Sequence, residues 1–225
     1  GRMVDFLAQN ADYVVRFQGG NNAGHTVVND FGEFKLHLLP SGVFNPKVTN
    51  ILGPGMVIDL QGLVEELEDL KERGITPNIK ISDRATICFP FHRMADGWEE
   101  ERLGDKAYGS TRRGIAPAYG DRTMKKAMQI GEILYPEHLQ DRLSQIVDWK
   151  HIQAEGIYGK KEPFTLQEML DWLDKYSAPI KELVCDTSAL LEKAAAENKN
   201  ILFEAQLGTL RDLNFRIYPF TTSSC

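Results

Sequence analysis

Cysteine, long apolar runs and excess positive charge are all scarce in this chain of 225 residues. Its three cysteines, Cys88, Cys185 and Cys225, are widely separated and lack the spacing of a metal site. We therefore expect free thiols in a reducing compartment, with the cytoplasm as the default. No apolar run approaches the roughly 20 residues of a membrane-spanning helix, and the N-terminus has no signal-peptide pattern. We therefore expect no membrane as a partner, and since the formal net charge is −6, we expect no nucleic acid either.

The composition is otherwise that of an ordinary folded protein. Hydrophobic residues make up 42% of the chain and charged residues 26%, which is typical of a soluble globular domain. The length of 225 residues suits one sizeable α/β domain, or one with a small helical insert. No internal repeat or low-complexity segment stands out.

Two periodic patterns alternate along the chain. Short apolar runs beside turn residues predict strands, and apolar residues recurring every three or four positions predict helices. This alternation predicts an α/β fold with a mostly parallel central sheet, surrounding helices and a helix-rich segment at about residues 120–198. A turn containing Asn29, Asp30 and Gly32 is expected to join two strands as a hairpin. Strands are predicted at 13–17, 27–28, 34–39, 50–52, 56–58, 80–88 and 201–204, and helices at 3–10, 60–73, 92–103, 137–153, 165–177 and 180–198.

A glycine-rich loop at residues 18–26 follows the first predicted strand. It contains three glycines and two asparagines, and ends on His25 and Thr26. Glycines allow positive φ angles and close backbone approach, so several N–H groups can point at one anion. The spacing matches neither the Walker pattern nor the dinucleotide fingerprint. Taken alone, the loop is equally compatible with a hairpin that carries a solvated histidine.

Together with four later segments, this loop resembles the adenylosuccinate synthetase family. The resemblance implies a P-loop-GTPase-like synthetase fold and a ligase of AMP biosynthesis. Such an enzyme joins IMP and L-aspartate to form adenylosuccinate, uses GTP and Mg²⁺, and releases GDP and phosphate. The segments keep their family order and span almost the whole chain: 18–26, 38–42 with 53–55, 109–119, 203–206 and 218–224.

The resemblance also implies that family segments are missing at both ends of the chain. The family places a phosphate loop with a catalytic carboxylate and a lysine before the first helix, and Gly1-Arg2 is interpreted as the last part of that loop. The segments that grip aspartate and read guanine would follow Cys225. We therefore expect residues 1–225 to be an internal fragment, a partial synthetase domain that is inactive alone.

The family's roles transfer to the loop residue by residue. His25 matches the catalytic histidine, a general acid near the purine 6-oxygen, and an imidazole suits that task because its pKa lies near neutrality. Asn22, Ala23, Gly24 and His25 match IMP contacts. Gly24, His25 and Thr26 match GTP contacts, and the Gly24 carbonyl matches a Mg²⁺ ligand. The other histidines are expected to be surface or packing residues: His37, His92, His138 and His151.

The segment at 109–119 matches the part of the family that holds the IMP 5′-phosphate. Thr111 matches a phosphate contact, and Arg112 and Arg113 are natural counter-charges. Lys125 stands where the family usually has an arginine that reaches the same phosphate from the neighbouring subunit. Lysine keeps the positive charge but cannot make the planar, bidentate contact of an arginine. The match implies a homodimer with shared active sites.

The last two segments depart from the commonest family pattern. The purine-contacting and catalytic glutamine usually stands one position later, where this chain has Leu207, so Gln206 is the candidate. Thr222 matches a second phosphate-contacting threonine. Arg216 replaces a preferred glycine, and a bulky residue is strained there if positive φ is required.

Two other functions compete with the ligase. A non-catalytic purine-nucleotide-binding protein would keep the IMP contacts without GTP chemistry, and Arg216 and the displaced glutamine favour it mildly. An RNA-binding patch at 112–113 and 125–126 rests on only four charges in an acidic chain without interleaved aromatic residues. The ligase is the better-supported prediction.

Overall fold

The computed structural model describes residues 2–29, 32–215 and 217–224. Asp30 of the expected hairpin turn, Arg216 and Cys225 lie outside the described residues, so the predictions made for them are not addressed by the structure. Among the helices that are described, none is long and apolar enough to cross a membrane.

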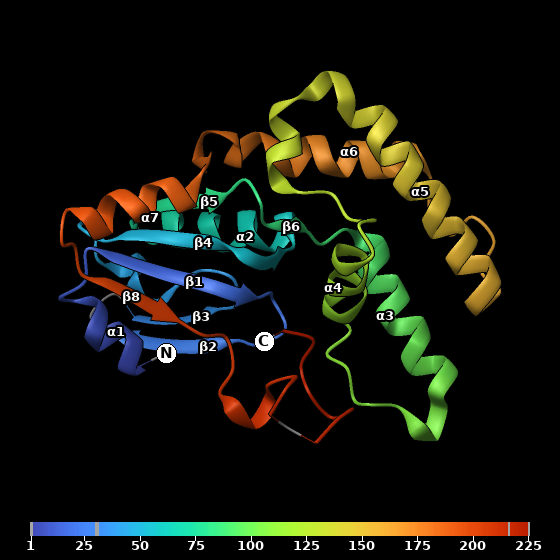
Figure 1. The fold of residues 1–225 in the computed structure, drawn as a ribbon, viewed down its shortest axis with the longest axis horizontal. Coiled ribbons are helices and arrows are strands. Elements are labelled where there is room, and N and C mark those ends of the chain that lie inside the picture. The colour runs from blue at the N-terminus through green and yellow to red at the C-terminus, as the bar shows by residue number, and fades with distance from the viewer. Residues whose placement is uncertain (1, 30–31, 216, 225) are drawn as a thin grey trace.

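A parallel sheet forms the centre of the molecule (Figure 1). Its strands run in the order β7-β5-β4-β1-β8, and β6 continues the sheet by pairing with the end of β4. Every pair in this sheet is parallel, which confirms the prediction. An antiparallel hairpin of β2 and β3 lies beside it. The strands are β1 Tyr13–Gly19, β2 His25–Asn29, β3 Gly32–Leu36, β4 Thr49–Ile58, β5 Asn78–Ser82, β6 Thr86–Ile87, β7 Val184–Cys185 and β8 Ile201–Glu204.

Helices surround the sheet, and those between residues 90 and 158 extend beyond the carboxyl ends of its strands (Figure 1). The central strands are buried on both faces, as parallel strands covered by helices and a hairpin are. Val14, Ile51 and Leu52 are fully buried. The helices are α1 Arg2–Ala8, α2 Leu60–Glu72, α3 Pro90–Leu103, α4 Ile115–Thr123, α5 Pro136–Tyr158, α6 Leu166–Ser177 and α7 Thr187–Ala196.

Several predicted elements need correction. The strands expected at 50–52 and 56–58 are one strand, β4, which runs through Gly53-Pro54-Gly55. A register shift on β1 absorbs the irregularity, and a Cβ on Gly55 would lie 2.2 Å from the Phe17 carbonyl oxygen, so only glycine allows this approach. The strand expected at 80–88 is broken by a turn into β5 and β6.

Two helical regions also differ from the prediction. The helix expected at 180–198 begins at Thr187, because a 3₁₀ turn at Ala178–Leu183 and strand β7 precede it, and Asp186 caps it by accepting the Ser188 and Ala189 N–H groups. Helix α4 had no counterpart among the predicted helices. Its sequence contains Pro117 and Gly120, which weaken helical propensity, so packing rather than propensity determines it.

Candidate functional site

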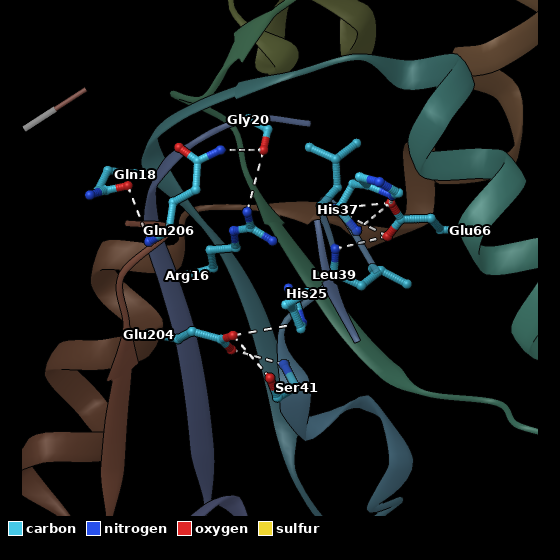
Figure 2. Close-up of polar contacts among 11 residues, drawn as sticks. Arg16, Gln18, Gly20, His25, His37, Leu39, Ser41, Glu66, Glu204 and Gln206 are labelled. Atoms are coloured by element: carbon cyan, nitrogen blue, oxygen red, sulfur yellow. Dashed lines mark hydrogen bonds and ion pairs between the residues drawn. The ribbon is translucent and has the colours of Figure 1, made fainter. Parts of the chain in front are cut away.

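The candidate site lies where β1 runs into the glycine-rich loop, at the carboxyl end of the parallel sheet (Figure 2). Ligands of open α/β sheets bind beyond these strand ends. Strand β8 is parallel to β1 and ends beside it, so Glu204 and Gln206 arrive next to Arg16 and Gln18 from almost the other end of the chain. The sheet thus joins two of the predicted motifs.

Arg16 is the buried charge of this region. It is register partner to Glu204 across β1 and β8, and only 1% of its surface is exposed. Its Nη2 donates to the Gly20 carbonyl at 3.3 Å, while Nε and Nη1 have no hydrogen-bond partner in the described part of the chain. Burial lowers the pKa of Arg16, and the charges of Glu204 and Glu66 oppose that shift. The guanidinium therefore retains unused donors at the end of the strand.

Glu204 connects three segments. Its carboxylate accepts the Ser41 N–H at 2.8 Å and the Ser41 hydroxyl at 3.0 Å. Its Oε1 also lies 3.8 Å from His25 Nε2, which is buried and lacks a hydrogen bond within the described residues. Burial, assisted by the charge of Arg16, lowers the pKa of His25 to about 3. The imidazole is therefore neutral near pH 7, and in the tautomer with a proton on Nε2 it presents a donor beside Glu204.

Gln206 belongs to a hydrogen-bonded cluster with two other predicted IMP residues, Asn22 and Thr222. Its Nε2 donates to the Gly20 carbonyl at 2.8 Å and makes a short hydrogen bond to the Asn22 side-chain oxygen. Asn22 in turn lies 3.5 Å from the Thr222 hydroxyl. Asn22, Gln206 and Thr222 therefore form one polar cluster, with His25 on the same loop.

Glu66 on α2 fixes the segment that follows β3. Its carboxylate accepts the backbone N–H groups of His37 at 2.8 Å and of Leu38 and Leu39 at 3.0 Å (Figure 2). His37, expected as a surface or packing residue, packs against the loop, because a Cβ on Gly24 would lie 2.9 Å from its Nε2. Glu66 and Glu204 thus hold residues 37–41 against the glycine-rich loop.

Two carboxylates on α3 fix the segment that is predicted to bind the phosphate. Asp96 accepts the Ser110 hydroxyl at 2.6 Å and the Gly114 N–H at 2.9 Å. Glu100 accepts two further N–H groups, those of residues 108 and 109. These contacts leave Thr111 exposed on the surface of the segment.

Some predicted residues stay apart from this polar cluster. Lys125 is exposed just after α4, with φ at +62°. Neither Lys125 nor Thr111 is hydrogen-bonded to His25 or Gln206 in the parts of the chain that are described. Thr26 is exposed on β2, and Ala23 and Gly24 lie in the loop, with Gly24 exposed.

The described residues include no cluster of three or more His, Cys, Asp or Glu side chains that could hold a metal ion. The predicted Mg²⁺ ligand, the Gly24 carbonyl, is a hard oxygen donor on an exposed loop residue. Mg²⁺ is commonly held by one or two protein oxygens, with water and substrate phosphates completing its shell. A single carbonyl therefore fits as one ligand of a shared site.

Sequence reasoning missed the residues that support the site. Arg16, Glu204, Ser41 and Glu66 were assigned no role, although Arg16 offered a signal, since an arginine within a predicted buried strand is rare unless it is functional or paired. Tyr119 on α4 was also missed. Its hydroxyl accepts the Gly19 N–H at 2.8 Å and donates to the Gly55 carbonyl at 2.7 Å.

Known proteins resemble the chain along its whole length. A family model described as adenylosuccinate synthetase matches residues 1–225. Adenylosuccinate synthetase 2 of Pseudoalteromonas translucida is 52% identical over 225 residues, and adenylosuccinate synthetase of Heliobacterium modesticaldum is 47% identical. The alignments cover 100% of this chain but 54% and 52% of those two proteins, so the chain spans about half the length of the curated relatives it matches.

Two solved structures share the fold. Fully ligated adenylosuccinate synthetase from Plasmodium falciparum matches with a TM-score of 0.88 at 29% identity, over 100% of this chain and 52% of that one. Cyanophage S-2L succinoaminodeoxyadenylate synthetase, bound to dGMP and dATP, matches with a TM-score of 0.62 at 20% identity, over 99% and 51%. The second likeness shows the fold alone, and the first confirms the predicted architecture.

Proposed function

The chain belongs to the adenylosuccinate synthetase family, and on that premise we propose that its residues bind IMP within a GTP-dependent ligase. The proposed reaction joins IMP and L-aspartate through a C–N bond to form adenylosuccinate, and releases GDP and phosphate. It is the first committed step from IMP to AMP. The observation that carries this proposal is the polar cluster of Asn22, Gln206 and Thr222 at the carboxyl end of β1, with His25 on the same loop.

Gln206 and Asn22 are proposed to bind the purine. Both are amides that present donors and acceptors, and without a ligand they satisfy each other. A purine would replace that mutual bond with bonds to its own polar edge. Ala23 and Gly24 would approach the nucleotide through their backbones.

His25 is proposed as the general acid beside the purine 6-oxygen. Its neutral imidazole can donate a hydrogen bond, and Glu204 lies 3.8 Å from Nε2 to orient the ring. An anionic phosphoryl group nearby would raise the pKa of His25 from its ligand-free value of about 3, because opposite charge favours the protonated form. Gln206 is proposed to assist by holding the purine against His25.

GTP and Mg²⁺ are proposed to meet the same loop. Gly24, His25 and Thr26 would contact the GTP phosphates, and the Gly24 carbonyl would supply one ligand of the ion. Mg²⁺, when bound, would neutralise charge on the transferring phosphoryl oxygens. The residues of this chain would bind and orient the nucleotides around it.

Thr111 and Thr222 are proposed to hold the IMP 5′-phosphate. Lys125 of the partner subunit is proposed to reach the same phosphate, which makes the active unit a homodimer with shared sites. Cytoplasmic location is also proposed, because Cys88 and Cys185 are unpaired thiols. Residues 1–225 are proposed to form one partial synthetase domain, with a helix-rich segment at about 120–198.

Turnover and binding are tested separately. Because the relatives are about twice as long, we expect the 225 residues alone to bind IMP without turnover. Calorimetry should detect IMP binding to the chain, and Gln206→Leu should weaken it relative to Gln167→Leu on the exposed face of α6. Absence of IMP binding would overturn the proposal.

The protein purified from its source cells is the sample for the activity assay. With IMP, GTP, Mg²⁺ and L-aspartate, it should form adenylosuccinate, while the 225-residue chain should not. Product from the chain alone would refute the proposed inactivity. IMP binding without turnover by the source protein would favour the non-catalytic purine-nucleotide-binding alternative.

A further inference from the structure

Tyr119 connects the two parts of the proposed nucleotide site. The purine part consists of the glycine-rich loop and Gln206. Of the two groups proposed to hold the phosphate, Thr222 lies beside Asn22 of the purine part, and Thr111 lies in a separate segment that runs from residue 109 to helix α4. Tyr119 is on α4, which lies beside the carboxyl end of β1 in Figure 1. Its hydroxyl accepts the Gly19 N–H at 2.8 Å and donates to the Gly55 carbonyl at 2.7 Å.

The first bond holds the residue on which Gln206 rests. Gly19 is at the end of β1 with φ at +87°, a conformation that glycine adopts without strain. The Gln206 side chain packs directly on it, because a Cβ on Gly19 would lie 2.0 Å from Gln206 Oε1 and 2.7 Å from Gln206 Cβ. The position of the Gly19 backbone therefore sets the position of the purine-binding amide.

The second bond holds α4 against the sheet. Gly55 belongs to β4 and packs closely on β1, with which it is in register at Gln18. Arg122, also on α4, donates to the Pro54 carbonyl at 2.9 Å. Helix α4 is therefore fastened to the same stretch of β4 at two points, and Tyr119 extends the connection to Gly19.

The opposite end of α4 continues into the segment that contains Thr111. Gly114, which precedes the helix, is held by Asp96, and Thr111 lies three residues earlier. A displacement of α4 relative to Gly19 would change the distance between Thr111 and the groups proposed to bind the purine.

We propose that Tyr119 is a positioning residue that sets the spacing between the purine-binding loop and the phosphate-binding segment. This inference rests on the proposed function. The Tyr119 ring packs beside the buried cluster of Val57, Cys88, Ile115 and Ala118. Phenylalanine at this position keeps the packing and removes only the hydroxyl. Tyr119→Phe therefore isolates the contacts of that hydroxyl, which also lies 3.5 Å from the Gly19 carbonyl oxygen.

Tyr119→Phe should weaken binding of IMP by about tenfold, because the free chain would hold the two parts at the binding-competent spacing for only about a tenth of the time. Binding of inosine alone and of ribose 5-phosphate alone should stay unchanged. Inosine would engage Gln206 without Thr111, and ribose 5-phosphate would engage Thr111 and Thr222 without Gln206. Only IMP therefore depends on the distance between Gln206 and Thr111 that Tyr119 is proposed to set.

The experiment is calorimetric titration of the chain with IMP, inosine and ribose 5-phosphate. Wild type, Tyr119→Phe and the control Tyr135→Phe are compared, because Tyr135 is exposed at the start of α5. Amide hydrogen exchange at Gly19 gives a second readout that needs no ligand, and exchange should be at least severalfold faster in Tyr119→Phe.

A loss confined to IMP, together with faster exchange at Gly19, supports the inference. Equal IMP affinity in wild type and Tyr119→Phe overturns it while leaving the proposed function intact. Equal weakening of all three ligands, or unchanged exchange at Gly19, also overturns it, because Tyr119 would then have a general structural role or no role at this strand end. A wild-type chain that does not bind IMP overturns the proposed function, and the inference with it.

Discussion

Buried titratable side chains occur both in the helices α3 to α5 and at the carboxyl end of β1, but their hydrogen bonding differs. In the helices, His92 Nε2 lies 2.8 Å from Asp121, and Lys150 pairs closely with the same carboxylate. At the strand end, Arg16 Nε and Nη1 and His25 Nε2 are buried without hydrogen-bond partners among the described residues. The strand end is the proposed nucleotide site, whereas the helical cluster lies among α3, α4 and α5.

This difference in hydrogen bonding distinguishes residues that support the fold from residues that would bind a ligand. Buried polar groups are normally satisfied, because an unsatisfied one loses its hydration without replacement. The titratable groups of the helices follow this rule and hold α3, α4 and α5 together. At the strand end Glu204 also follows it, through Ser41, but Arg16 and His25 do not, which is expected where a ligand supplies the missing partners. We expect substitutions in the helices to change stability, and substitutions at the strand end to change ligand binding more than stability.

Asp121→Asn should give the largest loss of stability. The substitution leaves the buried Lys150 ammonium without a counter-charge, and breaking a buried ion pair in this way costs about 3–5 kcal/mol. Urea denaturation measures the free energy of unfolding. Asp141→Asn, at an exposed position of α5, is the control and should stay within about 0.5 kcal/mol of wild type. A loss below about 1 kcal/mol for Asp121→Asn would remove the basis for the comparison.

Gly19→Ala should give the next largest loss, and Gly74→Ala is its matched control. Both glycines have positive φ, at +87° and +78°, so both substitutions introduce backbone strain of about 1–2 kcal/mol. A Cβ on Gly74 meets nothing within 4 Å, whereas a Cβ on Gly19 collides with Gln206. Gly19→Ala should therefore lose about 1–3 kcal/mol more than Gly74→Ala, and only Gly19→Ala should weaken IMP binding. Equal effects on both quantities would contradict the packing of Gln206 on Gly19.

Acid should destabilise the helical region through His92. Burial lowers the pKa of His92, although Asp121 opposes the shift. Between that lowered value and about 6.5, the unfolded chain binds more protons than the folded chain. The free energy of unfolding should therefore fall as the pH drops below about 6.5. His92→Gln should show a shallower fall than wild type, while a fall remains, because the pKa of His25 is lowered to about 3 and acts with the same sign.

His138→Gln is the control for this pH dependence, because His138 is exposed. Unfolding free energies from urea titrations at several pH values between 7 and 4 would give the slopes. Identical slopes for wild type and His92→Gln would show that His92 does not resist protonation in the folded chain.

The contrast between the two regions also shows what the sequence could predict. Local periodicity gave the parallel sheet, and the bounds predicted for β8 agree with the structure. The spacing of apolar residues did not predict α4, because Pro117 and Gly120 obscure its helical pattern. The β4 interruption was predicted because Gly53-Pro54-Gly55 looks like a turn, whereas the close backbone of β1 favours glycine at positions 53 and 55 inside a strand.

The residues of the candidate site also fall into two groups, those that local motifs predicted and those that they did not. The motif residues Asn22, Gln206 and Thr222 could be named from the sequence because each stands in a recognisable segment, and their functional roles stay predictions. The residues that support them could not be found locally. Arg16 and Glu204 meet through strand pairing between distant parts of the chain, and the Tyr119 contact to Gly19 spans 100 positions. Such contacts depend on the register of the sheet and on helix packing, which no local pattern contains.

Arg16→Met should give the smallest change in stability and is the sharpest test of the contrast. Replacing a buried guanidinium that lacks two partners with an apolar side chain removes a desolvation cost, so the free energy of unfolding should change by less than about 1 kcal/mol. Lys150→Met should be more destabilising by comparison, because it removes the cation that pairs with Asp121. IMP affinity, measured by calorimetry, should fall in Arg16→Met and stay near wild type in Lys150→Met. If the two variants lose stability equally, the strand-end charge is structural, and its missing partners do not mark a ligand site.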